Sequence, residues 1–249
     1  MSGHSKWATI KHKKGAADKA RAKVFNKIAR LLEVAAREGG ADPTSNASLR
    51  TVMQKAKAAQ MTNDAIDRAV KRGAGLADGG NYESIMYEGY APGGVALMID
   101  VLTDNRNRTG AEVRNIFSKL GGSMAEPGAV GWQFSRRGVL HVNAADEDAV
   151  MMAALEAGAD DVSPDGDKAW RIMCEPADVF DVREALQAAG LEVVSAESTM
   201  VSSLTVEVTD IGDAKKILRI MDALEDNDDV QDVFSNFDIS EELMEAVGE

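Results

Sequence analysis

The residues of this chain whose type and spacing suit a chemical task are the cations near its start. Residues 1–30 contain nine basic residues and one acid, a net charge of +8 in a chain whose total is −13. Dense lysine and arginine displace counterions from an anionic polymer, and an indole offers a ring for base stacking. We therefore predict a nucleic-acid-binding arm, with packing of Trp7 on a helix as the alternative role for its ring. Its candidate residues are Lys6, Trp7, Lys11, His12, Lys13, Lys14, Lys19, Arg21, Lys23, Lys27 and Arg30.

The positive charge continues into the next segment. Residues 1–75 hold 16 Lys or Arg and 6 Asp or Glu, a net charge of +10, whereas residues 76–249 carry −23. Such asymmetry indicates a basic part that binds an anion and an acidic body that repels nonspecific nucleic acid. The alternative is that both parts only have solvated helix surfaces. The further candidates for nucleic-acid binding are Lys55, Lys57, Arg68, Lys71 and Arg72.

A second candidate anion site precedes a predicted helix. Arg106 and Arg108 lie just before Thr109, which has capping-box spacing to Glu112 and so predicts a helix start. Free backbone N–H groups and the helix dipole favour a phosphate at such a terminus. The alternative is a structural loop in which Asp104 pairs with an arginine.

Groups suited to catalysis or metal binding do not cluster in the sequence. The histidines are His4, His12 and His141. His4 and His12 have no carboxylate or thiolate at ligand spacing, and we expect His141 to be a surface or satisfied strand residue. Cys174 is the single cysteine and is expected to pack in a core. The acidic run at residues 225–229 lacks EF-hand spacing and is interpreted as a solvated turn. We predict no catalytic residue, no metal, no cofactor and no small-molecule substrate.

Composition is typical of a globular protein, with 45% hydrophobic and 28% charged residues in 249. The longest apolar run, residues 149–155, is far shorter than the ~20 residues of a membrane-spanning helix, and we expect no membrane partner. A lone cysteine and the lack of an apolar leader predict a cytoplasmic location.

Three amphipathic helices should position the cations. Val24, Ile28 and Leu32 form one apolar face of a helix from about Ala17, with the lysines and Arg30 on the neighbouring face. Asn46 and Thr62 are N-cap residues for a second and a third helix. We predict that residues 1–75 are a basic arm and a three-helix bundle.

Beyond a linker at residues 76–81 the pattern changes to strands, and the predicted fold class is multidomain α+β. Residues 138–199 have the order β-α-β-β-α-β of a ferredoxin-like unit. We expect this unit to be inserted into a discontinuous α+β domain, residues 81–136 plus 202–240, with an acidic tail at 241–249. Among the strands predicted for it are residues 129–135 and 229–239. Three consecutive domains would give the same local pattern.

The chain resembles the YebC family over its length. The resemblance is carried by MSGHSKWATIKHKKGAADKARAKVF at 1–25, KAKAAQMTNDAIDRAVKRGAG at 55–75, LTDNRNRTGAEVRNIFSKLGG at 102–122 and LEDNDDVQDVFSNFDI at 224–239. It implies a helical N-terminal domain and two α+β domains, the third inserted in the second. It departs at Ala47, where relatives often have Pro, and in the loop at 123–134.

The family includes probable transcriptional regulators and mitochondrial translational activators of cytochrome c oxidase. The resemblance therefore implies a non-enzymatic regulator whose partner is either ribosomal RNA on the ribosome, with relief of stalling, or promoter DNA. No helix-turn-helix recognition helix can be identified in the sequence, which favours RNA. A protein-interaction scaffold and a nucleic-acid-processing enzyme are the alternatives.

Overall fold

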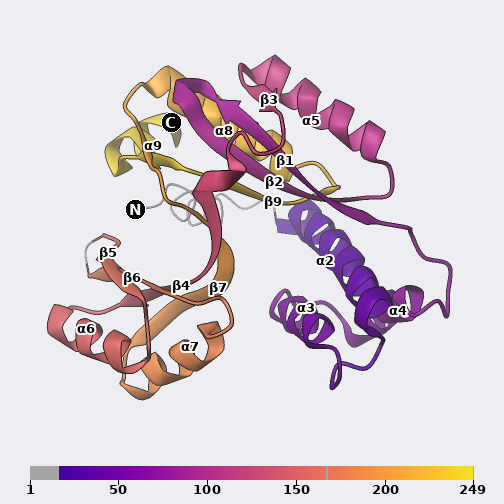
Figure 1. The fold of residues 1–249 in the computed structure, drawn as a ribbon, viewed down its shortest axis with the longest axis horizontal. Helices are drawn as coiled ribbons and strands as arrows, with labels where there is room; N and C mark the ends of the chain where they lie inside the picture. Colours follow the sequence, from indigo (N-terminus) through magenta and orange to yellow (C-terminus); the bar gives the residue numbers. More distant parts are fainter. Residues whose placement is uncertain (1–16, 167, 249) are drawn as a thin grey trace.

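The structure of the chain, a computed structural model, describes residues 17–166 and 168–248 and has the mixed α+β composition that the sequence predicted. Figure 1 shows three groups of elements: a helical bundle, a sheet backed by α5 and α8, and a second sheet backed by α6 and α7. The bundle and the second sheet lie on the same side of the first sheet, as two separate lobes. Each group has its own buried apolar cluster.

The bundle consists of α2 (Ala17–Gly39), α3 (Ala47–Ala58) and α4 (Asn63–Gly73). Both predicted N-caps are confirmed, because the side chains of Asn46 and Thr62 accept hydrogen bonds from the third residue beyond them. The Asn46 amide is buried and also donates to the carbonyl of Ala35, which ties the end of α2 to the start of α3. The core is made of apolar side chains that include Ile28, Leu32, Leu49 and Ile66.

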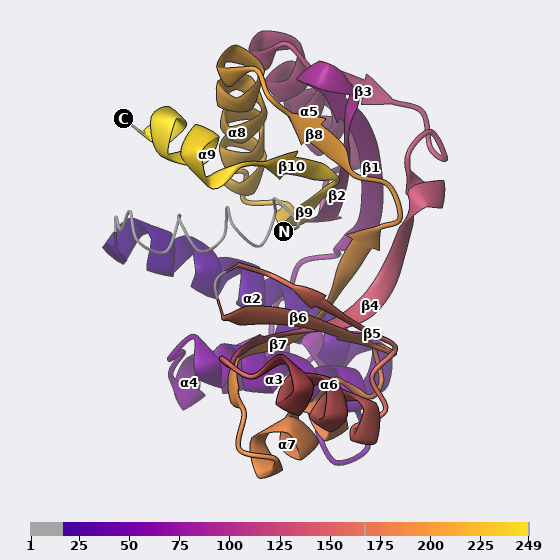
Figure 2. The same cartoon turned by 90° about the vertical axis from the view of Figure 1, so that its left-hand side faces the viewer.

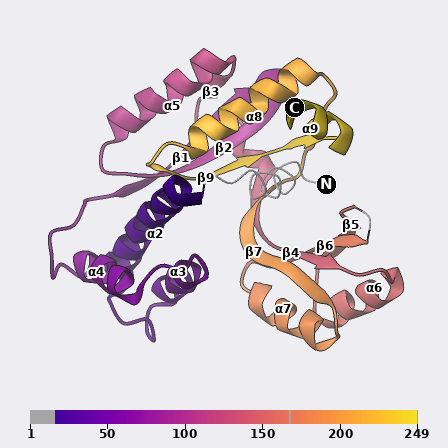
Figure 3. The ribbon, with the colours of Figure 1, turned by 180° about the vertical axis from the view of Figure 1, so that it is seen from behind.

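The first α+β unit has the sheet order β3-β1-β2-β9. Its strands are β1 (Glu83–Ala91), β2 (Val95–Thr103), β3 (Ser123–Ala125) and β9 (Val230–Ser235), and a 3₁₀ turn at Pro92–Gly94 joins β1 to β2. Helices α5 (Arg106–Leu120) and α8 (Ile211–Glu225) lie side by side on one face, as Figure 3 shows. Central strand β2 is buried on both faces, which explains its continuous apolar run.

Three details of this unit differ from prediction. Helix α5 begins at Arg106 with Asn105 as its cap, three residues before Thr109. Residues 129–135 are not one strand, since Gly131–Gln133 form a 3₁₀ helix. The predicted strand at 229–239 breaks into β9 and β10 (Phe237–Ile239) at Asn236, whose side chain accepts from the backbone N–H of Ala96 and so interrupts the ladder.

The segment predicted as an acidic tail is a helix that packs on the first α+β unit. Residues Glu241–Gly248 form helix α9, and Met244 is buried in the same core as α8. Beside it, β10 pairs in parallel with β8 (Val206–Val208). The apolar positions of this segment, which the acid count concealed, provide the contact.

The second α+β unit contains β4 (Phe134–Asn143), α6 (Glu147–Glu156), β5 (Asp161–Pro164), β6 (Ala169–Cys174), α7 (Val179–Ala188) and β7 (Glu192–Ser202). Its antiparallel sheet has the order β5-β6-β4-β7, the ferredoxin-like arrangement. Strands β4 and β7 extend beyond their predicted ends and pair along their whole length, from Phe134 opposite Ser202 to Asn143 opposite Glu192. Figure 2 shows this long pair leading from one α+β unit into the other. That the two units are separate domains stays a prediction.

Candidate nucleic-acid interface

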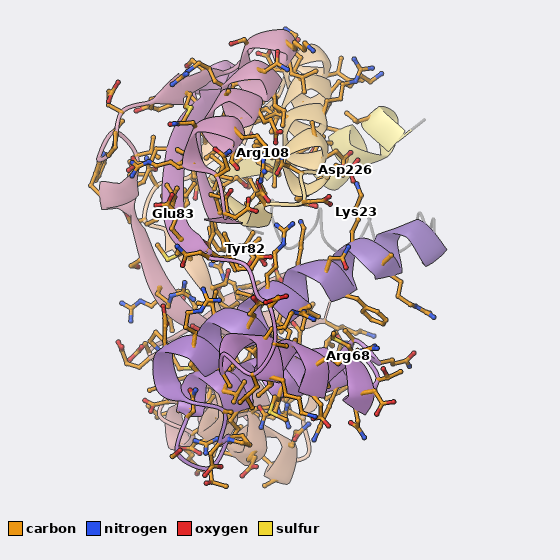
Figure 4. All side chains as sticks on the ribbon, turned by 90° about the vertical axis from the view of Figure 1, so that its right-hand side faces the viewer. Lys23, Arg68, Tyr82, Glu83, Arg108 and Asp226 are labelled. Carbon is orange, nitrogen blue, oxygen red and sulfur yellow. The ribbon has the colours of Figure 1, made fainter. Side chains whose placement is uncertain are left out.

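The basic face of α2, which carries Lys23, Lys27 and Arg30, lies against the acidic loop. This loop, residues 225–229, joins α8 to β9. The Lys23 ammonium is 3.1 Å from the Asp226 carboxylate and 3.0 Å from the same residue's carbonyl oxygen. Figure 4 shows the two side chains pointing toward each other. Lys27 donates to the Glu225 carbonyl at 2.7 Å. The acidic loop is therefore a docking site for α2 rather than the solvated turn that the sequence predicted.

Asp229 is the centre of this contact, and it is only 4% exposed. Its carboxylate accepts hydrogen bonds from Arg30 at 2.7 Å, Arg108 at 2.7 Å, Thr109 at 2.6 Å and Thr103 at 3.1 Å. Burial by itself raises the pKa of Asp229, but the Thr109 hydroxyl and the two guanidinium groups outweigh it and lower the pKa to about 2. One ionised carboxylate thus joins the bundle to the start of α5.

At the predicted phosphate site, Arg108 pairs with Asp104, as expected if the loop is structural. The Arg108 guanidinium lies 2.9 Å from the Asp104 carboxylate as well as 2.7 Å from Asp229, and these hydrogen bonds raise its pKa. Arg106 is exposed, and its carbonyl accepts from the Tyr87 hydroxyl. A carboxylate of the chain itself therefore satisfies Arg108, where the sequence had suggested a phosphate.

Glu33 is a second buried acid, and it pairs with Arg72, which the sequence predicted to bind nucleic acid. It is 2% exposed and accepts from the Arg72 side chain at 3.0 Å and from the backbone N–H of Gly80 at 2.7 Å. Arg37, one turn along α2, lies 3.6 Å from the same carboxylate. This cluster fixes the linker to the bundle, so Arg72 has a structural partner.

The other described candidates have a different environment. They are exposed and form no ion pair with another described residue, and they are Arg21, Lys55, Lys57, Arg68 and Lys71. All lie in the bundle, and Figure 4 shows Arg68 on its outer side. The exposed cations, as we call these five, are the part of the predicted surface, among the described residues, that is open to a ligand.

The remaining candidates cannot be placed. Lys6, Trp7, Lys11, His12, Lys13 and Lys14 lie outside the described residues, and the side chain of Lys19 does too, although its backbone belongs to α2.

The histidine and the cysteine in the described part of the chain have structural roles. The His141 ring nitrogen Nδ1 lies 2.7 Å from Asp165, which confirms a satisfied strand residue. Cys174 is fully buried, as predicted for a core residue, and burial raises the pKa of its thiol. Within residues 17–166 and 168–248, no three His, Cys, Asp or Glu side chains group closely enough to hold a metal ion. No helix in the same part of the chain is long and apolar enough to cross a membrane.

Comparison with known proteins identifies the family. The model of the TACO1/YebC N-terminal domain matches residues 5–76, and that of the TACO1/YebC second and third domain matches residues 82–237. The chain belongs to the TACO1/YebC family. Relatives named probable transcriptional regulatory protein, from Salinispora tropica and Halothermothrix orenii, are 54% and 51% identical to it over the full length of both chains.

A solved structure supports the same relationship. The crystal structure of a conserved hypothetical protein from Aquifex aeolicus superposes with a TM-score of 0.77 at 42% identity, covering 90% of this chain and 93% of that one. The fold of this TACO1/YebC member therefore resembles an experimentally determined one over almost all of its length.

The residues that sequence reasoning missed are the buried acids Asp229 and Glu33. Each lies in a segment that also contains exposed acids, and composition does not tell the two kinds apart.

Proposed function

We propose that this TACO1/YebC protein is a non-enzymatic, nucleic-acid-binding regulator of gene expression that acts in the cytoplasm. Its binding surface is the basic arm together with the exposed cations Arg21, Lys55, Lys57, Arg68 and Lys71. The observation that supports this most is that these five side chains are exposed and form no ion pair with a described acid, while Lys23, Lys27, Arg30 and Arg108 contact the acidic loop. Relatives named as regulatory proteins agree with it.

Of the two nucleic acids, we propose RNA, and specifically the ribosome. A DNA-binding helix-turn-helix needs two helices packed on each other, so that the second can enter the major groove. Here α3 and α4 are close in sequence, but each packs against α2 and hardly against the other. The acidic first α+β unit lies next to the bundle and would oppose a duplex that extends past it. A folded RNA can approach the bundle from one side.

The charge variant that tests this surface is Lys55→Ala/Lys57→Ala/Lys71→Ala. A matched control, Lys119→Ala/Lys215→Ala/Arg219→Ala, removes three exposed cations of the first α+β unit. Each phosphate contact to a single strand contributes about −0.7 to the slope of log affinity against log salt. The bundle variant should therefore flatten the slope by about 2 for every sequence, and the control should leave it unchanged. Equal effects in both variants would refute the proposed surface.

Ultraviolet cross-linking in cells, followed by sequencing of the recovered RNA and DNA, separates the two targets. Enrichment of ribosomal RNA that is lost in the bundle variant supports the proposal. Enrichment at a few promoters, with ribosomal RNA at background, would make the protein a transcriptional regulator instead.

A further inference from the structure

Trp132 is 69% exposed, although tryptophan is among the residue types that are most buried on average. It lies in the 3₁₀ helix Gly131–Gln133, between β3 and β4. Val130, two residues before it, and Phe134, two residues after it, are buried in one apolar cluster with Met98 of β2. The loop is therefore anchored on the first sheet and leaves the indole outside.

Hydrogen bonds fix the backbone on both sides of Trp132. The buried carboxylate of Glu88 accepts from the backbone N–H of Gly131 at 2.8 Å. The side-chain oxygen of Gln133, which is also buried, accepts from the Asn236 amide at 2.9 Å. A group that is held in place before a partner arrives loses little entropy on binding. The loop therefore presents the indole in a form that is ready to bind.

A second aromatic ring meets the indole at one carbonyl oxygen. Nε1 of Trp132 donates to the carbonyl of Ala129 at 3.1 Å, and the Tyr90 hydroxyl donates to the same oxygen at 3.2 Å. Tyr90 lies near the end of β1 and is 37% exposed. Because the N–H and O–H donors of the two rings are already used, the rings offer mainly their faces to a partner. Such faces suit a flat group that stacks.

The two rings border the face of the first sheet that is turned away from α5 and α8. Tyr90 pairs with Ala96, and Met86 pairs with Asp100. Ala96 belongs to the cluster under the loop, so these four side chains share that face. Figure 1 shows the bundle on this side of the sheet. The open face, as we call it, is therefore turned toward the surface for which we propose RNA binding.

Positive charge lies farther along the open face. Burial and Asp232 raise the pKa of Asp100, and the nearby charges of Arg136 and Lys55 partly offset this shift. Lys55 is one of the exposed cations of the bundle, and Arg136 is exposed on β4. Asp100 lies four steps from Tyr90 along the β1–β2 ladder, about 14 Å at about 3.4 Å per residue. Asp100 and Asp232 oppose a phosphate over the middle of the face, so a strand's backbone should follow the cations at its rim.

Aromatic rings beside positive charge are typical of proteins that bind single strands, because bases stack on the rings while cations contact the phosphates. Exposed aromatics on a sheet face bind RNA bases in the same manner. We propose that Trp132 and Tyr90 form a stacking site for an unpaired base of an RNA strand. The phosphates of this strand contact Lys55 and Arg136. The stacking site rests on the proposed function and adds the place where a base binds.

The test uses the full-length protein and two labelled ten-nucleotide strands, oligoadenylate and an abasic strand of the same length. Trp132→Ala should weaken oligoadenylate binding by about fivefold or more, the usual effect of removing a stacking ring. It should change neither abasic-strand binding nor the slope against salt, because no phosphate contact is lost. Trp132→Phe keeps a ring and should recover most of the affinity. The control Phe180→Ala, which removes an exposed ring of α7, should have no effect.

The other outcomes separate the stacking site from the proposed function. If the bundle variant Lys55→Ala/Lys57→Ala/Lys71→Ala weakens oligoadenylate binding and Trp132→Ala does not, the stacking site is overturned and the function stands. An equal loss for the abasic strand in Trp132→Ala would also overturn the stacking site, since that strand has no base. Binding that depends on Trp132 but not on the three lysines would support the stacking site and refute the proposed cationic surface. Binding of neither strand would refute both.

Discussion

Replacing Asp229 by asparagine should destabilise the protein, because this carboxylate joins the bundle to the first α+β unit. Its pKa is lowered from 3.8 to about 2, and at 1.36 kcal/mol per unit this difference corresponds to about 2.5 kcal/mol of stability at neutral pH. The carboxylate is buried, but Arg30 and Arg108 keep 23% and 45% of their side chains exposed and regain water when released. We therefore expect a loss of about 2 kcal/mol.

The assay is equilibrium unfolding in urea at pH 7, with Asp226→Asn as the control. Asp226 lies in the same acidic loop and pairs with Lys23, but its side chain is 75% exposed. Exposed pairs contribute about 0–1 kcal/mol, so the control should stay close to the parent protein. If both variants lose the same small amount, Asp229 does not join the two parts as the geometry indicates.

The pH dependence of the same comparison gives an independent test. Because the folded-state pKa of Asp229 is lowered, its contribution is fully present above the unfolded value of 3.8 and is lost as the pH falls to about 2. The difference in unfolding free energy between the parent and Asp229→Asn should therefore be constant from pH 7 to about pH 4.5 and should shrink below it. A constant difference down to pH 2 would contradict the reasoning.

Two further carboxylates give predictions of opposite sign. Burial raises the pKa of Glu88, but the backbone N–H groups of Gly128, Val130 and Gly131 outweigh it and lower the pKa. Glu88→Gln should therefore destabilise the protein by about 1–3 kcal/mol at pH 7. It should also make the loop at residues 126–131 more sensitive to proteolysis. Burial and the facing carboxylate of Asp232 raise the pKa of Asp100. Asp232→Asn should therefore stabilise the protein by about 0.5 kcal/mol at pH 7, measured by thermal unfolding. This gain should vanish in acid, once Asp100 is protonated.

Local structure followed from the sequence wherever a short-range cause acts. Asn46 and Thr62 cap helices because their side chains reach the backbone three residues ahead. The order of helices and strands in residues 138–199 was legible from apolar periodicity. Helix α5 begins earlier than predicted because Asn105 caps it. Thr109 lies inside the helix, where it is buried and donates to Asp229, 120 positions away in the chain.

The charge pattern by itself determined that this protein has a basic start and an acidic body, and the length of the matching segments determined its family. Only the tertiary structure decided which cations are open to a ligand. Lys27 and Lys55 are both lysines of amphipathic helices, but Lys27 meets the acidic loop about 200 residues along the chain and Lys55 remains exposed. The physical reason is that charges attract across any chain separation once folding brings them together, so a local pattern gives the sign of a side chain but not its partner.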